Sequence, residues 1–183
     1  MKLHIGCGTV YREGWINVDN NSDHNITKLD LNWDVSNPIP YPDNSVDFIS
    51  SEHFIEHLPI QTAIKFLKEC KRVLKIGGVI RTSSFDLDDL ILAARKDNDN
   101  WKQDIGATGI FASVQTRAEF FNLAFYNWGH RYLYTTEEMI RRYKEVGFTQ
   151  IKACKIQESD HVELRNLETR YNTTMNVEAT KTE

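Results

Sequence analysis

Long apolar runs are missing from this chain of 183 residues. No stretch approaches the roughly 18 consecutive apolar residues that cross a bilayer, and the first one, residues 3–5, is too short for the core of a secretory signal. The three cysteines are widely spaced and form no Cys-x-x-Cys pair of the kind that binds zinc or performs redox chemistry. The sequence therefore predicts a cytoplasmic protein with reduced thiols and no membrane partner.

A strong excess of positive charge is missing as well. The formal net charge is -4, which gives no overall attraction for nucleic acid. The basic stripe of Arg141, Arg142 and Lys144 is better explained as a solvated helix face than as a nucleic-acid site. Hydrophobic residues at 40% and charged residues at 26% are ordinary for a globular protein. We expect one domain over residues 1–165 and no nucleic-acid partner.

Strand-sized apolar segments alternate with turn signals in the first half of the chain. The segment 59–74 differs, because its apolar side chains recur at steps of three and four residues, the period of an amphipathic helix. Strands that alternate with helices predict an α/β fold with a mostly parallel sheet and helices on both of its faces. The expected strands are residues 2–5, 15–18, 45–50 and 78–85.

The middle of the chain is harder to interpret. A second helix is expected over residues 87–96, followed by a polar break at residues 97–100. The segment 101–134 holds more aromatic side chains than a plain connector requires, from Trp101 and Phe111 to Tyr134. We expect it to form a cap or lid, and its aromatic cluster is either part of the core or the wall of an acceptor pocket.

The last part of the chain changes from a regular pattern to a polar one. Thr135 or Thr136 is expected to cap a helix that ends at Glu145, and residues 149–157 are expected to form the last strand. The polar composition that follows predicts a flexible tail over residues 166–183.

Two glycines and an aspartate follow the first two predicted strands. Gly6 and Gly8, in the segment IGCG, allow the backbone to approach a ligand closely. Asp19, at the end of WINVD, has a carboxylate that can accept both hydroxyls of a ribose. Taken alone, the glycine pair is equally consistent with a tight turn after a buried strand.

Joined with the later segments, these residues resemble the class I S-adenosylmethionine-dependent methyltransferases. The chain has, in that family's order, a Gly-rich first loop, an acid ending the second strand, Asp34 before the stretch PIPYPD, and a helix leading into KIGG. The resemblance covers residues 2–157 and is closest to a compact bacterial and phage-associated branch. It implies a Rossmann-like sheet with a terminal antiparallel strand, S-adenosylmethionine as the cofactor, and methyl transfer as the activity.

The resemblance also implies a role for particular residues in binding the cofactor. Asp19 would hold the ribose, Asp34 would accept from the adenine amino group, and Val35 would supply an amide and an apolar contact. The methionine half would be bound by backbone amides and by two side chains that follow the predicted strand 45–50 and face the sulfonium. The residues of this half are Gly6, Cys7 and Gly8 for the backbone, and Ser51 and Glu52 for the side chains.

One feature departs from the family pattern. Val10 stands where a third glycine is usual, and only eleven positions separate Gly8 from Asp19. A crossover between parallel strands normally needs a dozen residues or more, so the first crossover helix is expected to be shortened to about one turn. This departure makes a catalytically inactive cofactor-binding module a second hypothesis, and a sheet face left uncovered would favour a homodimer.

The segment His53–His57 also spells His-x-x-E-His, the inverted zinc-peptidase motif with His53, Glu56 and His57. That motif needs a continuous helix, whereas Pro59 follows almost immediately, so we expect no metal site. If the methyl acceptor must lose a proton, the candidate bases are His53, His57 and His130. The sequence does not identify the acceptor, and we favour a small molecule or a sugar.

Overall fold

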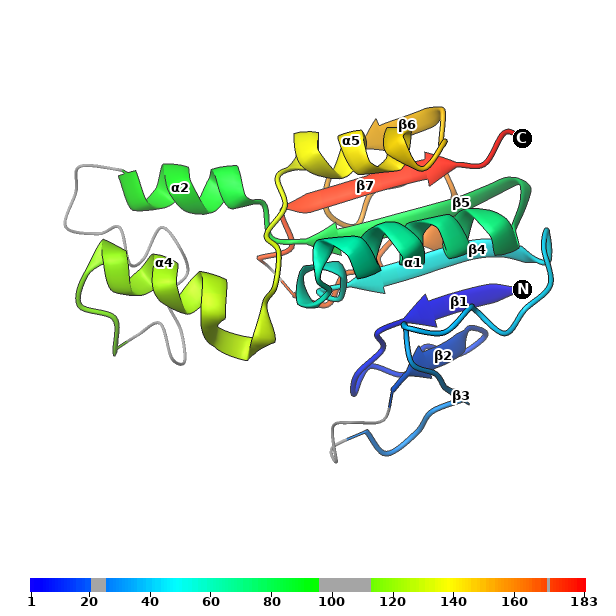
Figure 1. The fold of residues 1–183 in the computed structure, drawn as a ribbon, viewed down its shortest axis with the longest axis horizontal. Coiled ribbons are helices and arrows are strands. Elements are labelled where there is room, and N and C mark those ends of the chain that lie inside the picture. The colour runs from blue at the N-terminus through cyan, green and yellow to red at the C-terminus, as the bar shows by residue number, and fades with distance from the viewer. Residues whose placement is uncertain (21–25, 96–112, 171) are drawn as a thin grey trace.

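A computed structural model describes residues 1–20, 26–95, 113–170 and 172–183 of the chain. Seven strands form one sheet in the order β3-β2-β1-β4-β5-β7-β6 (Figure 1). Their bounds are β1 Lys2–Ile5, β2 Ile16–Asp19, β3 Leu31–Asn32, β4 Val46–Glu52, β5 Leu74–Ser84, β6 Gln150–Ala153 and β7 Met175–Thr180.

The sheet is mostly parallel. The pairs β1–β2, β1–β4, β2–β3 and β4–β5 are parallel, whereas β7 runs antiparallel to both β5 and β6. The expected Rossmann-like sheet with a terminal antiparallel strand is therefore confirmed. Because the parallel strands all point the same way, the loops that follow β1, β2, β3 and β4 meet at one edge.

The expected helices are present with nearly the expected bounds. They are α1 Ile60–Val73, α2 Leu87–Arg95 and α5 Thr136–Glu145, and α4 Arg117–Tyr126 is added to them. Pro59 stands at the N-cap of α1, where its fixed φ suits the start of a helix. The hydroxyl of Thr135 accepts from the amide of Glu138 and so caps α5.

The two faces of the sheet are covered differently. Side chains alternate between them, so Ile80 of β5 packs in the main core with α1 and α5, while Val79 packs on the other face with Trp15 and Leu164. Among the described residues, the cover of that second face includes the 3-10 turn η4 Val162–Leu164 in place of an α-helix. The helical layers on the two faces are thus very unequal.

The first crossover, residues 6–15, contains turns and no helix, so even the single helical turn expected there is missing. Arg12 spans part of the space beneath it. Its guanidinium donates to Ser50 Oγ at 2.9 Å and to the backbone carbonyl of Leu167 at 2.7 Å. This side chain ties the short crossover to β4 and to the segment that covers the second face.

The prediction of a flexible tail over residues 166–183 is wrong. This segment includes β7, which lies between β5 and β6 and is almost entirely buried. Its polar side chain Glu178 is 5% exposed because it pairs with the buried Arg81 of β5. A polar sequence misled the prediction, because the partners of its polar groups are far away along the chain.

The aromatic-rich segment does not form one unit among the described residues. Helices α2 and α4 extend as a lobe away from the sheet (Figure 1), where Phe120 is buried against Ala94 and Val114. Tyr126 is 77% exposed, whereas Tyr134 is buried in the main core. Trp101, Phe111 and the polar break at residues 97–100 lie outside the described residues.

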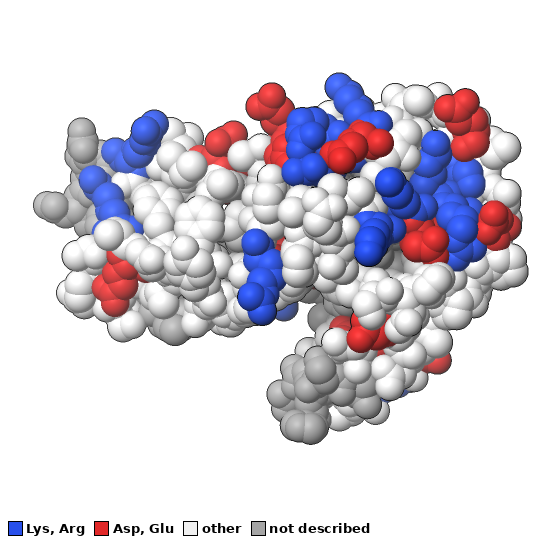
Figure 2. All heavy atoms as spheres, viewed as in Figure 1, with Lys and Arg blue, Asp and Glu red and all other residues white. Residues whose placement is uncertain are grey.

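The charges on the surface are mixed in sign. Figure 2 shows basic and acidic side chains side by side over α1 and α5. Arg141 and Arg142 both form ion pairs with Glu138 and Glu145 on the same helix. Among the described residues, no helix has both the length and the apolar character required to cross a lipid bilayer.

Candidate functional site

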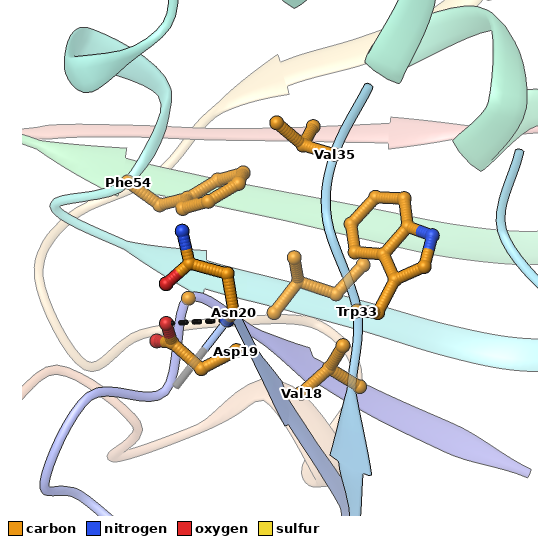
Figure 3. Close-up of a pocket in the computed structure, with 8 residues that line it drawn as sticks. Val18, Asp19, Asn20, Trp33, Val35 and Phe54 are labelled. Carbon is orange, nitrogen blue, oxygen red and sulfur yellow. Dashed lines mark hydrogen bonds between the residues drawn. The ribbon is translucent and has the colours of Figure 1, made fainter. Parts of the chain in front are cut away.

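A pocket opens at the edge of the sheet where the parallel strands end. Strands β1 and β2 and the loops after β3 and β4 contribute residues to it, as expected for ligand sites in open α/β sheets. Figure 3 shows the Phe54 ring and Val35 on one side of the opening and Asp19 on the other. The lining residues are Ile5, Gly6, Val18, Asp19, Asn20, Trp33, Val35 and Phe54.

The glycine turn after β1 forms one wall of this pocket. Gly6 has φ +68°, and a Cβ placed there would lie 2.4 Å from the Phe54 ring, so only glycine fits. Gly8 has φ +51° and open space where a side chain would stand. The backbone of the turn is therefore open to approach at Gly8, whereas at Gly6 the Phe54 ring packs against it.

Asp19 joins the turn to the end of β2. Its Oδ2 accepts from the Gly8 amide at 2.9 Å, and its Oδ1 accepts from the Asn20 amide at 2.7 Å. Each carboxylate oxygen has further lone pairs, so the group can still accept hydroxyl donors from a ligand. These two bonds hold the carboxylate at the pocket wall.

Three of the predicted binding residues, Gly8, Asp34 and Cys7, stand next to the pocket without lining it. The carboxylate of Asp34 is exposed and accepts from the Ser36 amide at 2.8 Å, which lowers the pKa of Asp34. Cys7 is 4% exposed, and burial together with the Asp19 charge raises the pKa of its thiol to about 11. Cys7 therefore stays a neutral thiol.

Ser51 and Glu52, predicted to face the sulfonium, do not line the pocket either. Ser51 is 1% exposed, and its Oγ has no hydrogen-bond partner among the described residues. The Glu52 carboxylate accepts from the Thr169 and Arg170 amides and from the Thr173 hydroxyl. Glu52 thus anchors the segment 169–173 to the end of β4.

The segment His53–His57 does not form the helix of a zinc peptidase. His53 has φ +48°, and only a 3-10 turn, η1 Ile55–His57, follows it. The His53 ring contacts Glu56 Oε1 at 3.0 Å and Thr173 Oγ1 at 3.2 Å, so both of its nitrogens are engaged. The inverted motif is present in the sequence only.

His57 and His130, two of the three candidate bases, meet instead. Their rings are edge to face with centroids 4.9 Å apart. Burial, opposed by the Glu56 charge and joined by His130, lowers the pKa of His57, which favours a neutral imidazole. Burial disfavours the ionised form of Glu56, but the hydrogen bonds and charge of His53 outweigh it and hold the pKa of Glu56 below its usual value.

The sequence revealed Val35 but not the two aromatic walls of the pocket, Phe54 and Trp33. Phe54 lies inside the segment interpreted for its histidines and glutamate, and Trp33 follows β3, a strand of two residues that is too short to predict. The available signal was their position directly after predicted or possible parallel strands, where ligand-binding loops gather. Asn20 could have been found in the same way, since it follows Asp19.

A family model described as a methyltransferase domain matches residues 17–82. No curated protein is a significant match to the chain. Among solved structures, a methyltransferase from Thermotoga maritima, described as a possible histamine N-methyltransferase, is 18% identical with a TM-score of 0.61, covering 98% of this chain and 81% of that one. One from Archaeoglobus fulgidus is 17% identical with a TM-score of 0.59, covering 98% and 85%. At these identities the likeness shows a shared fold.

Proposed function

We propose that this protein is an S-adenosylmethionine-dependent methyltransferase that acts on a small molecule or a sugar. The observation that carries the proposal is the meeting of Gly6 and Asp19 in one pocket at the carboxyl edge of the sheet, with the Gly8 amide bonded to the Asp19 carboxylate. The methyltransferase-domain match over residues 17–82 and the class I methyltransferase fold support the same activity. S-adenosylmethionine is the cofactor to which they point.

The residues of the pocket suit the two ends of that cofactor. Asp19 offers acceptor oxygens for ribose hydroxyls, and Trp33, Val35 and Phe54 provide apolar surface for a flat base. The exposed backbone at Gly8 leaves room for close approach of the polar end. Asp19, Trp33, Val35 and Phe54 line the pocket, and Gly8 lies beside it, bonded to Asp19.

The reaction requires no covalent bond between the protein and either reactant. When bound, S-adenosylmethionine supplies a methyl carbon on a positively charged sulfur, whose transfer to an acceptor oxygen or nitrogen breaks the carbon–sulfur bond, leaves the electron pair on sulfur and releases the acceptor's proton. The protein's contribution is to hold the two reactants at a productive distance. His57 lies in η1 after β4, and the ring of His130, which follows α4 in the chain, meets it there, where the acceptor side of the pocket is expected.

A calorimetric titration with S-adenosylmethionine tests this function, with Asp19→Ala as the informative variant. A charge-assisted hydrogen bond contributes about 1.5 to 3 kcal/mol, so the variant should bind at least about tenfold more weakly. Asp160→Ala is the matched control, because the Asp160 carboxylate is exposed and forms a surface ion pair with Lys152 Nζ.

Three results would count against the proposal in different ways. Equal affinities of Asp19→Ala and the wild type for S-adenosylmethionine would show that Asp19 does not bind the cofactor. Absence of binding by the folded wild-type protein would overturn the whole function. Binding without methyl transfer to any of a panel of sugars and small metabolites would favour the inactive binding module, which the missing first crossover helix also favours.

A further inference from the structure

Glu56, His57 and His130 bring three metal-binding groups together just after β4. Each side chain offers one ligand atom, and these atoms all lie within 4.8 Å of one another. Two ligands that are each about 2.1 Å from an ion can be at most about 4.2 Å apart. A movement of under about 1 Å would therefore let all three side chains reach a single ion.

The Glu56 carboxylate is only half satisfied. Glu56 is 1% exposed, and its Oε1 accepts from Ser84 Oγ at 2.8 Å and contacts the His53 ring at 3.0 Å. Its Oε2 is buried and has no hydrogen-bond partner among the described residues. A buried carboxylate oxygen without a partner is costly, so this atom indicates that a cation belongs beside it.

The His130 imidazole is held in the way metal-binding histidines are usually held. His130 Nδ1 lies 2.6 Å from the carbonyl oxygen of Ala124, so Nδ1 carries the proton and Nε2 keeps a free lone pair. A bond of this kind, from the second ring nitrogen to a backbone carbonyl, fixes the tautomer and orientation of a metal ligand. His57 Nδ1 faces the backbone of the turn at Trp128 and Gly129, 3.9 Å from where a Cβ of Gly129 would stand.

The backbone that presents His130 is fixed as well. Trp128 has φ +56° and Gly129 has φ +79°, a tight turn that directs the chain back toward η1. The Arg131 amide then donates to the carbonyl oxygen of Glu56 at 2.7 Å. The turn and this bond join two segments that are more than 70 positions apart along the chain.

We propose that Glu56, His57 and His130 bind one divalent transition-metal ion of the zinc type. Two imidazoles and one carboxylate form a ligand set that leaves further positions of the ion open. The ligand of the open positions rests on the proposed function: it is a hydroxyl oxygen of the methyl acceptor. The cluster begins two residues after Phe54 of the cofactor pocket, so it lies next to the place of methyl transfer. In this role His57 and His130 hold the ion instead of acting as bases.

Zinc binding by the purified full chain, stripped of metal with a chelator, tests the site without any activity measurement. We expect one equivalent of Zn²⁺ to bind the wild type and His130→Asn to bind at least about 100-fold more weakly, because even outer-shell changes cost 10- to 100-fold. The matched control is His161→Asn, since His161 contacts Phe48 on the other face of the sheet. This control should keep the wild-type affinity.

A second variant and a second ligand keep the outcomes distinct. Glu56→Gln should also lose Zn²⁺, provided that its thermal melt shows a folded protein. No Zn²⁺ binding by the wild type, or equal affinity in His130→Asn, overturns the metal site. If the wild type binds S-adenosylmethionine but does not bind Zn²⁺, the metal site alone is overturned. If it binds Zn²⁺ but does not bind S-adenosylmethionine, the metal site is upheld and the methyltransferase proposal is overturned.

Discussion

Replacing Arg81 should reveal how strongly β7 depends on a buried ion cluster. Arg81 is fully buried in β5, and its guanidinium donates to Glu168 Oε1 at 2.6 Å and to Glu178 Oε1 at 2.7 Å. It also donates to the backbone carbonyls of Glu158 and Lys155. One side chain thus joins β5, β7 and the segment that covers the second face of the sheet.

The variant Arg81→Met keeps much of the apolar volume and removes the charge. Both carboxylate side chains are at most 6% exposed, so they would remain buried without their cation. Breaking a buried pair by removing one partner costs about 3 to 5 kcal/mol. That is a large part of the roughly 5 to 15 kcal/mol by which a domain is stable.

Urea denaturation followed by circular dichroism measures this loss. Glu168 keeps bonds from Ser83 Oγ and from the Gln157 amide, so adding Glu178→Gln to Arg81→Met should recover more stability than adding Glu168→Gln. Arg141→Met is the control, because the Arg141 side chain is itself exposed and its surface ion pairs contribute little.

The reasoning has a clear failure point. A loss for Arg81→Met no larger than the loss for the Arg141 control would mean that the cluster does not hold β7 in the sheet. If Glu178→Gln and Glu168→Gln recover the same free energy of unfolding, the role of the cluster stands. The prediction that Glu178 depends more on Arg81 than Glu168 does would then be wrong.

Two further predictions concern β1 and the turn after it. Gly6→Ala should lower both the thermal stability and the S-adenosylmethionine affinity more than Gly14→Ala, as measured by thermal melts and titrations. Both glycines have positive φ, but of the two only Gly6 would bring a Cβ against the Phe54 ring. Equal effects of the two substitutions would refute that contact. Burial and the Arg12 charge lower the pKa of His4 to about 3 from an unfolded value near 6.5. The folded state thus holds His4 neutral, so the contribution of His4 to the free energy of unfolding is complete above pH 6.5 and is lost at about 1.4 kcal/mol per pH unit as the pH falls toward 3. His4→Gln should therefore make the free energy of unfolding, measured by urea denaturation, depend less on pH in this range. An unchanged pH dependence would refute the prediction.

Much of the fold could be predicted from local pattern. The apolar period of α1, the threonine cap of α5 and the four strand-sized segments in the first part of the chain each depend on neighbours in sequence. These signals suffice because a helix or strand that buries one face must show that face in its own residues.

The candidate site was only partly predictable. Gly6, Asp19 and Val35 line the pocket as the resemblance implied, but Glu52 contacts the segment 169–173 and Asp34 lies outside the lining. The ends of strands can be located in a sequence, whereas the direction of a side chain beyond the strand end depends on loops that contact it from elsewhere.

The sequence by itself determined the mostly parallel sheet, the positions of its longer strands in the first half of the chain, and the glycine and aspartate at the ends of the first two. Only the tertiary structure decided that residues 175–180 form an inner strand and that His57 meets His130. The reason is the same in both cases: Glu178 is neutralised by Arg81, 97 positions away, and Glu56 and His57 meet a histidine more than 70 positions further on. Groups that look polar or isolated along the chain become buried or clustered only when distant segments supply their partners.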